Sequence, residues 1–225
     1  MSDVEPVPDP LDADPRVPQF FGAAWPQVRA FRDLLADQGV LRGLIGPREV
    51  GRLWERHLLN SAAVVPFLPE RGTIVDLGSG AGLPGVVVAA MRPAATVVLL
   101  EPMERRTTWL TEVAERLELS NVVVRRARAQ EALDLQADAL TTRAVAALDK
   151  LYGWAMPLVA PGGQLVALKG DRAREEVTAA AKQAKRNDVL RVEVEEVATI
   201  DGVAPTWVVV ATKQAGARRG GADVR

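Results

Sequence analysis

The residues with the clearest chemical potential are the glycines and the acid of one short stretch, DLGSGAGLPG at positions 76–85. It overlaps the end of a short apolar run, residues 73–77, that is typical of a strand. Glycines after a strand allow a tight turn and let a ligand approach the backbone closely. In open α/β sheets, ligands bind at the carboxyl ends of the strands, where such a loop lies. The stretch therefore predicts a small-ligand site, with a plain turn as the alternative.

Two ligand classes compete for this loop. The pattern G-x-G-x-x-G over 80–85 fits dinucleotide sites, in which a pyrophosphate lies against a helix N-terminus. The pattern D-x-G-x-G-x-G over 76–82 resembles the first motif of S-adenosylmethionine-dependent methyltransferases, whose ligand has no phosphate. Asp76 would repel a pyrophosphate but suits the sulfonium and ammonium groups of that ligand. Glu101, which ends the next predicted strand, can accept hydrogen bonds from both ribose hydroxyls, although acids in NAD sites do the same.

The sequence also restricts which atom could accept a methyl group. Methylation of cytosine C5 requires a cysteine nucleophile, and the chain has no cysteine. Enzymes acting on exocyclic amines usually carry an acid or amide, two prolines and an aromatic residue after the fourth strand, whereas residues 141–145 read TTRAV. Arg143 suits a phosphate, the cofactor carboxylate or the O6/N7 edge of guanine. Guanine N7 carries a free lone pair, so its methylation needs orientation but no general base.

Four segments together resemble those of a known family: RHLLNS at 56–61, VDLGSGAGLPG at 75–85, TRA at 142–144 and ALKG at 167–170. Over about residues 43–212, the chain resembles the bacterial 16S ribosomal RNA guanine-N7 methyltransferases, once called glucose-inhibited division protein B. The resemblance implies S-adenosylmethionine as methyl donor and a guanine in the decoding-region loop of small-subunit rRNA as acceptor. It also implies a cytoplasmic enzyme that works on the small ribosomal subunit. The chain departs from the family at Asn60, where Asp is usual, and at 43–45, where GLI replaces Asn-Leu-Thr.

The motif and the resemblance assign roles to individual positions. The expected cofactor-binding residues are Asp76, Gly78, Gly80, Gly82, Leu83, Glu101, Ala129, Gln130 and Arg143. The expected catalytic residues are Arg143 and Lys169, which would orient the base. For Arg143 we expect this orientation to act through the acceptor atoms of guanine. No metal ion is expected, because the chain has one histidine and no cysteine.

Basic side chains near the predicted strand ends are candidates for RNA contact. Two arginines begin a predicted helix, where the helix dipole disfavours cations, so a phosphate partner would explain them. His57 lies on the apolar stripe of another predicted helix, where a packed histidine is the alternative; for its neighbour Arg56 the alternative is a solvated side chain. The expected RNA-facing residues are Arg56, His57, Arg105, Arg106, Arg128 and Lys169.

The elements that must position these residues alternate along the chain. Short apolar strands are predicted at 73–77, 96–100, 121–124, 140–142 and 164–168, with helices at 84–91, 104–117, 147–159 and 172–186 between or after them. Strands at 190–199 and 206–212 are close enough to form a hairpin. This pattern predicts an α/β fold: a Rossmann-like, doubly wound, mostly parallel methyltransferase sheet with an antiparallel last strand. The expected parts are a disordered acidic tail (1–18), an N-terminal helical extension (19–69), the methyltransferase domain (70–213) and a flexible basic tail (214–225).

Composition fits this interpretation. The chain has 225 residues with a net charge of −1, yet positions 1–15 contain five acids and no base, which leaves a mildly basic body that permits RNA binding. No apolar run is long enough to suggest a membrane span, and a monomer is expected. A small-molecule methyltransferase of the same fold, an NAD-linked oxidoreductase and a non-catalytic ribosome-binding factor are the alternatives.

Overall fold

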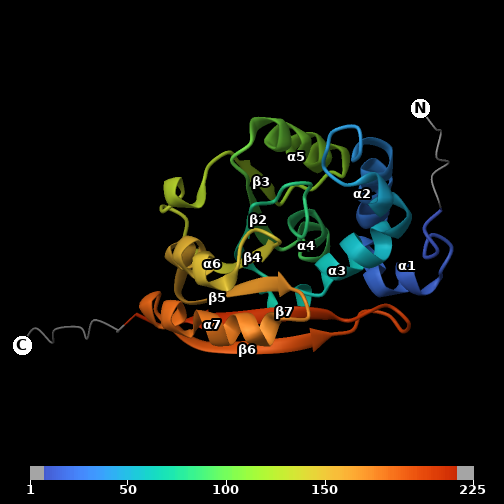
Figure 1. The fold of residues 1–225 in the computed structure, drawn as a ribbon. Coiled ribbons are helices and arrows are strands. Elements are labelled where there is room, and N and C mark those ends of the chain that lie inside the picture. The colour runs from blue at the N-terminus through green and yellow to red at the C-terminus, as the bar shows by residue number, and fades with distance from the viewer. Residues whose placement is uncertain (1–7, 217–225) are drawn as a thin grey trace, which may run out of the picture.

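The computed structural model describes residues 8–216 and folds them around a seven-stranded sheet (Figure 1). The strands are β1 (Gly72–Leu77), β2 (Ala95–Leu100), β3 (Val122–Arg125), β4 (Ala137–Arg143), β5 (Val159–Lys169), β6 (Val189–Val197) and β7 (Thr206–Lys213). Their order is β3-β2-β1-β4-β5-β7-β6. The pairs are parallel except those of β7, which runs antiparallel to β5 and β6. The predicted fold class is confirmed.

Two apolar cores lie on the two faces of this sheet. Successive side chains of a strand point to opposite faces. In β1, Ile74 therefore enters one core and Val75 the other, and in β2 Leu99 and Leu100 divide in the same way. This double burial explains why the strands read as nearly continuous apolar runs in the sequence.

Helices cover both faces. The first core contains α4 (Gly85–Met91) and α5 (Glu104–Arg116) together with α1 (Arg16–Phe21), α2 (Trp25–Gln38) and α3 (Asn60–Ala62). The second core contains α6 (Leu148–Ala155) and α7 (Ala173–Arg186). Figure 1 shows the N-terminal helices, in blue and cyan, beside α4. The N-terminal extension thus shares one core with the sheet and does not form a separate hydrophobic unit.

Short irregular helical turns complete the structure. The predicted helix around residues 50–62 consists of η2 (Pro47–Arg52), a π-helical turn η3 (Trp54–Leu59) and α3 in succession. The other short turns are η1 (Gly22–Ala24), η4 (Val65–Phe67), η5 (Ala129–Glu131) and η6 (Met156–Leu158). Residues 161–163 read PGG, which is typical of a turn between the predicted helix and strand, but they lie within β5, where the pairing with β4 shifts register between Ala137 and Ala139. Glycine is needed at 163, because the Cβ of any other residue would lie only 2.8 Å from the Asp138 carbonyl oxygen.

Residues 8–18 differ from the predicted disordered tail. The buried Asp9 carboxylate accepts a hydrogen bond from the Trp54 backbone N–H (2.9 Å). Asp12 accepts from the Trp54 indole N–H (2.9 Å) and pairs with Arg32 (2.6 Å). These acids therefore satisfy donors of the helical segment, a role that composition alone does not reveal. The rest of that predicted tail, residues 1–7, and residues 217–225 of the predicted basic tail lie outside the described residues.

The order of the strands determines where a ligand can bind. The chain moves outward from β1 to β3, then returns to β4 on the other side of β1. Such a switch point leaves a crevice at the carboxyl ends of the two central strands. Within residues 8–216, no helix combines the length and apolar character needed to cross a bilayer.

Candidate functional site

The glycine loop leaves β1 at the switch point and folds back toward β2. The Gly78 N–H donates to the Leu100 carbonyl (2.8 Å), which ties the loop to the end of β2. Gly78, Gly80 and Gly82 have φ values of 73°, 55° and 104°, a region that disfavours other residues. A Cβ on Gly78 would lie 2.7 Å from Val145, whereas a Cβ on Gly80 would meet nothing closer than 3.7 Å. Gly78 is therefore required by packing, while Gly80 faces open space.

Glu101, at the end of β2, forms the floor of the site. Its side chain is 2% exposed, and its two oxygens accept hydrogen bonds from the backbone N–H groups of Gly80 (2.9 Å) and Met103 (3.0 Å). The Arg106 guanidinium lies 3.7 Å away. This arrangement fixes the carboxylate in one orientation. Its remaining lone pairs can accept hydrogen bonds from two hydroxyl groups. The geometry suits a ribose diol.

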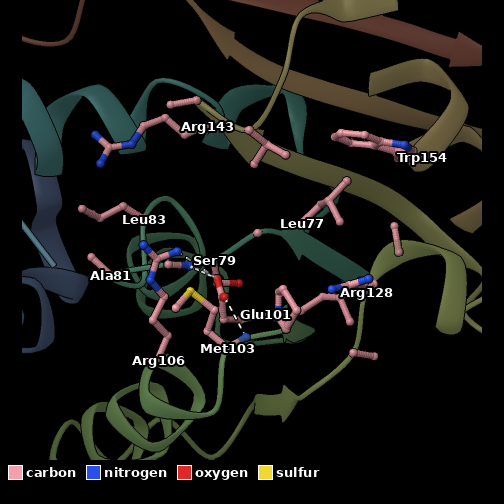
Figure 2. Close-up of a pocket in the computed structure, with 18 of the residues that line it drawn as sticks. Leu77, Ser79, Ala81, Leu83, Glu101, Met103, Arg106, Arg128, Arg143 and Trp154 are labelled. Carbon is pink, nitrogen blue, oxygen red and sulfur yellow. Dashed lines mark hydrogen bonds and ion pairs between the residues drawn. The ribbon is translucent and has the colours of Figure 1, made fainter. Parts of the chain in front are cut away.

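A cavity of about 610 Å³ opens above this carboxylate (Figure 2), within the range of small-ligand sites. The ends of β1, β2 and β4 and the segment after β3 surround it. Of the predicted residues, its lining includes Gly78, Gly80, Leu83, Glu101, Arg106, Arg128, Ala129, Gln130 and Arg143. The structure therefore brings most of the predicted cofactor residues together, although they come from four separate segments.

Asp76 does not line the cavity, contrary to the prediction that this acid lies beside the ligand. It is fully buried beneath the loop, where its Oδ2 accepts from the Gly85 N–H (3.0 Å) at the start of α4. Its Oδ1 has no hydrogen-bond partner among residues 8–216, and burial raises the pKa of this carboxyl group to about 7. An internal carboxylate thus occupies the helix N-terminus that a pyrophosphate would use. This contact argues against a dinucleotide ligand more directly than the predicted position of Asp76 beside the ligand.

Gly82 also lies outside the cavity lining. A Cβ at this position would come within 2.8 Å of Val86 and 3.1 Å of Phe31. Its role is therefore to let α4 and α2 approach the loop. The third glycine of the motif acts through packing, not through ligand contact.

Arg143, at the end of β4, is anchored by the N-terminal extension. Its Nη1 donates to the Arg56 carbonyl oxygen (3.0 Å), and its Nη2 lies 3.0 Å from His57 Nδ1. A guanidinium can only donate, so Nδ1 must accept and the imidazole proton must be on Nε2. That Nε2 lies 3.2 Å from Glu49 Oε1. Burial and the nearby Arg143 charge lower the pKa of His57 to about 4, which keeps the ring neutral at pH 7.

The predicted RNA-facing residues are placed unequally. Arg106 and Arg128 line the cavity and His57 is buried against Arg143, whereas the side chains of Arg56 and Arg105 are exposed and do not line it. Lys169 is nearly buried. Its ammonium donates to the Ala146 carbonyl oxygen and to Glu176 Oε2, both at 2.8 Å. Lys169 thus holds the segment after β4 against α7, beside a second cavity.

Sequence reasoning missed part of the cavity wall. Met103, Val145 and Trp154 line it, with Trp154 on α6 facing the cavity in Figure 2. The position of Trp154 depends on how α6 packs against the sheet, whereas Met103 and Val145 each follow a predicted site residue, Glu101 and Arg143, by two positions. Glu49, which faces His57, was also missed, although its place three residues after Gly46 is typical of a capping acid; its Oε2 accepts from the Gly46 N–H (2.7 Å).

The residues present fit S-adenosylmethionine better than a dinucleotide. Glu101 offers an oriented acceptor pair for the ribose, and apolar side chains on both sides of the cavity can enclose a flat adenine ring. Gly80 leaves room where any side chain would enter the ligand space. The first amide of α4 is already occupied by Asp76. Within residues 8–216, no group of three or more potential ligands is arranged to hold a metal ion.

Comparison with known proteins gives a consistent result. Residues 25–202 match the family described as rRNA small subunit methyltransferase G. A ribosomal RNA small subunit methyltransferase G of Thermobifida fusca is 53% identical over 180 residues, covering 77% of this chain and 76% of the relative. The protein of the same name from Bifidobacterium adolescentis is 40% identical and covers 93% of this chain and 96% of its own.

Solved structures with low sequence identity share the fold. A SAM-dependent O-methyltransferase of Thermotoga maritima has a TM-score of 0.56 at 19% identity, covering 70% of this chain and 66% of that one. TYW2 of M. jannaschii, in complex with AdoMet, has a TM-score of 0.54 at 17% identity, covering 69% and 74%. At such identities the likeness concerns the architecture alone.

Proposed function

Because the chain belongs to the rRNA small subunit methyltransferase G family, we propose that it transfers a methyl group from S-adenosylmethionine to guanine N7 in 16S rRNA. The single observation that carries the cofactor assignment is the Glu101 carboxylate, oriented by two backbone amides at the floor of the cavity. The names of the relatives supply the rRNA substrate. The choice of N7 rests on the resemblance to the 16S rRNA guanine-N7 methyltransferases, and it fits a site in which no general base is needed. Because its substrate is ribosomal RNA, we expect the enzyme to act in the cytoplasm, as part of the same proposal.

The chain binds the cofactor through three kinds of contact in this proposal. Glu101 accepts the ribose hydroxyls, Ala129 and Gln130 flank the adenine, and the backbone around Gly80 lies against the amino-acid portion. When bound, S-adenosylmethionine supplies an electrophilic methyl group. The apolar wall formed by Leu83, Met103 and other side chains excludes water from that group.

The reaction requires no general base. The N7 lone pair forms the new bond to the methyl carbon as the carbon–sulfur bond breaks, and the electron pair of that bond stays on sulfur. The products are S-adenosylhomocysteine and a positively charged 7-methylguanine, and no proton moves. Pre-orientation of two reactants can contribute roughly 7–11 kcal/mol to lowering such a barrier.

Arg143 serves orientation in this scheme. A guanidinium opposes the positive charge that the guanine ring gains, so it does not stabilise that charge in the transition state. Its planar donors instead fit acceptor atoms of the guanine. The His57 and Arg56 contacts fix the plane of the guanidinium before substrate binds.

A transfer assay tests the proposal. Purified protein is incubated with tritiated S-adenosylmethionine and small ribosomal subunits from cells that lack the enzyme, or with free 16S rRNA. Tritium in rRNA and 7-methylguanosine in the nuclease digest are expected. Label at another base atom would contradict the N7 assignment, and no label despite cofactor binding would indicate a non-catalytic factor. Calorimetry with S-adenosylhomocysteine and with NAD separates the two cofactor classes.

A further inference from the structure

A second cavity adjoins the cofactor cavity. It measures about 420 Å³ and lies at the carboxyl ends of β4 and β5. Arg143, Ala144 and Val145 line both cavities, so the two cavities adjoin along one short segment. A group bound in the second cavity would therefore lie beside the cofactor cavity, next to the Arg143–Val145 segment. This position is the one that a methyl acceptor requires.

Besides Arg143, two charged side chains line the second cavity, and they form an ion pair with each other. Lys169 Nζ lies 2.8 Å from Glu176 Oε2 and uses a second proton on the Ala146 carbonyl, which leaves its third proton for a ligand. Glu176 Oε2 also accepts from the Leu148 N–H (3.2 Å). Glu176 Oε1 makes no hydrogen bond within residues 8–216. The cavity thus presents a free acceptor and a free donor side by side.

This order of groups matches one edge of guanine. Around its ring, guanine presents the N2 amino group and N1–H as donors, then O6 and N7 as acceptors. A carboxylate oxygen complements N1–H and the amino group, and a neighbouring ammonium complements O6. With these contacts made, N7 comes next along the ring after O6 and carries no contact, so its lone pair stays free for the methyl group. Adenine presents no N1–H and carries a donor in place of O6, so it does not fit.

We propose that the second cavity binds the acceptor guanine, with Glu176 reading N1–H and the amino group and Lys169 reading O6. The inference rests on the proposed function and adds the base subsite. It assigns Glu176, a residue with no sequence motif of its own, as the determinant of guanine specificity. It also gives Lys169 a role in substrate contact that its ion pair with Glu176 prepares.

The first test fills the cavity without disturbing the core. Gly170 lines the second cavity, and a Cβ there meets nothing within 4 Å. We expect Gly170→Phe to lower methyl transfer to small subunits more than tenfold, while calorimetry shows unchanged affinity for S-adenosylhomocysteine. Gly153→Phe is the matched control, because Gly153 also has open space around it and lines neither cavity. The control should transfer methyl groups at the wild-type rate.

The second test measures base recognition without methyl transfer. Protein saturated with S-adenosylhomocysteine is titrated with GMP, IMP and AMP and followed by saturation-transfer NMR. IMP lacks the amino group, and one lost hydrogen bond to a charged acceptor weakens binding roughly tenfold. We expect GMP to bind more tightly than IMP, AMP to bind weakest, and Glu176→Gln to reduce the GMP preference. Gly170→Phe should abolish GMP binding.

The outcomes separate the two proposals. Wild-type protein that transfers no methyl group to rRNA refutes the proposed function, and the nucleotide titration then decides the second cavity alone. Equal binding of GMP and AMP by the wild type overturns the base subsite. Methyl transfer or GMP binding by Gly170→Phe at the wild-type level overturns it as well. A GMP preference that disappears in both Glu176→Gln and Gly170→Phe supports it.

Discussion

In the proposed function, Glu101 is a carboxylate that the fold orients before its ligand binds. Two backbone amides hold its oxygens, so the side chain is already oriented when the cofactor arrives. A preorganised acceptor avoids the loss of side-chain freedom that binding would otherwise cause. Ligand binding at this position should therefore depend on two oriented acceptor oxygens and not only on a negative charge.

The substitution Glu101→Gln tests this arrangement. The amide nitrogen of Gln would face a backbone N–H donor, so one oriented acceptor is lost. Hydrogen bonds to charged groups contribute roughly 1.5–3 kcal/mol, so we expect the Kd for S-adenosylhomocysteine to rise about ten- to hundredfold by calorimetry. Glu104→Gln, at an exposed position on α5, should leave the Kd unchanged. Equal affinities for the two variants would contradict the assignment of Glu101.

Gly80 provides a steric test of the same cavity. A side chain there would meet no protein atom closer than 3.7 Å but would stand in the ligand space. We expect Gly80→Val to abolish binding of S-adenosylhomocysteine, with a loss of stability of about 1–3 kcal/mol from the positive φ. Calorimetry and urea unfolding measure the two effects. Unchanged cofactor affinity would show that the loop is only a turn.

His57 is expected to act as a positioning residue through Arg143. His57→Ala removes the acceptor for Arg143 Nη2, so we expect a lower kcat for rRNA methylation and little change in cofactor affinity. His57→Asn can place an amide oxygen near the former Nδ1 and should restore part of the kcat. Steady-state kinetics with small ribosomal subunits as substrate distinguishes the His57→Ala variant from the His57→Asn variant. If both variants lose the same activity and the same stability, His57 is a packing residue only.

At the scale of elements, the N-terminal extension contributes to the site as well as to the core. The segment from η2 to α3 supplies both acceptors that hold Arg143. That segment is in turn fixed by acids from residues 8–15, which bind the backbone and the indole of Trp54. The chain before the sheet thus supports the end of β4.

Asp12→Ala should weaken this support. It removes the acceptor for the Trp54 indole and the partner of Arg32. We expect the free energy of unfolding to fall by roughly 1–3 kcal/mol in urea denaturation, because a buried donor loses its partner. Asp37→Ala, at an exposed position on α2, should change it by less than about 0.5 kcal/mol. A fall no larger than that of the control would mean that residues 8–15 add no stability.

Hydrophobic periodicity was sufficient to predict the helices and strands of the sheet, because strands buried on both faces have a strong apolar signal. It failed where tertiary contacts override composition. The acids near the N-terminus read as a solvated tail, since nothing local shows that Trp54 needs acceptors. The glycines at 162 and 163 read as a turn, since only the register with β4 makes them a bulge.

At the scale of the whole molecule, two buried titrating groups have opposite effects on how the free energy of unfolding depends on pH. The pKa of Asp76 rises from 3.8 to about 7, so its contribution to stability is present at low pH and lost as pH rises toward 7. The pKa of His57 falls from 6.5 to about 4, so the unfolded chain binds the extra proton and stability rises with pH across that window. Over much of the acidic pH range, the fall in stability caused by Asp76 and the rise caused by His57 therefore offset each other.

Asp76→Asn should expose this balance. Without the ionising carboxyl group, the variant gains stability relative to the wild type as pH increases. We expect the difference in unfolding free energy to grow by a few kcal/mol between about pH 5 and about pH 8. Urea unfolding at both pH values measures it, with Asp37→Asn as the exposed control. A difference that does not depend on pH would mean that Asp76 titrates normally.

The candidate site was partly predictable for a reason that applies to the whole fold. Parallel strands place their carboxyl ends at one edge, so Glu101 and Arg143 could be assigned to one site from their positions after predicted strands. Side chains from helices lack such a rule. Trp154 and Glu176 reach the two cavities, and Glu49 reaches His57, only because of how α6, α7 and η2 pack, and the sequence carries no spacing that shows these contacts.

The direction of β7 has a practical consequence. Its antiparallel course takes the chain to Lys213, whose ammonium binds the Val159 carbonyl oxygen at the start of β5. The backbone therefore leaves the sheet at the amino ends of the parallel strands, on the side away from both cavities. A tether, purification tag or fluorophore attached after residue 216 would begin at the edge of the sheet opposite both cavities, which makes this position suitable for immobilising the protein on a sensor surface.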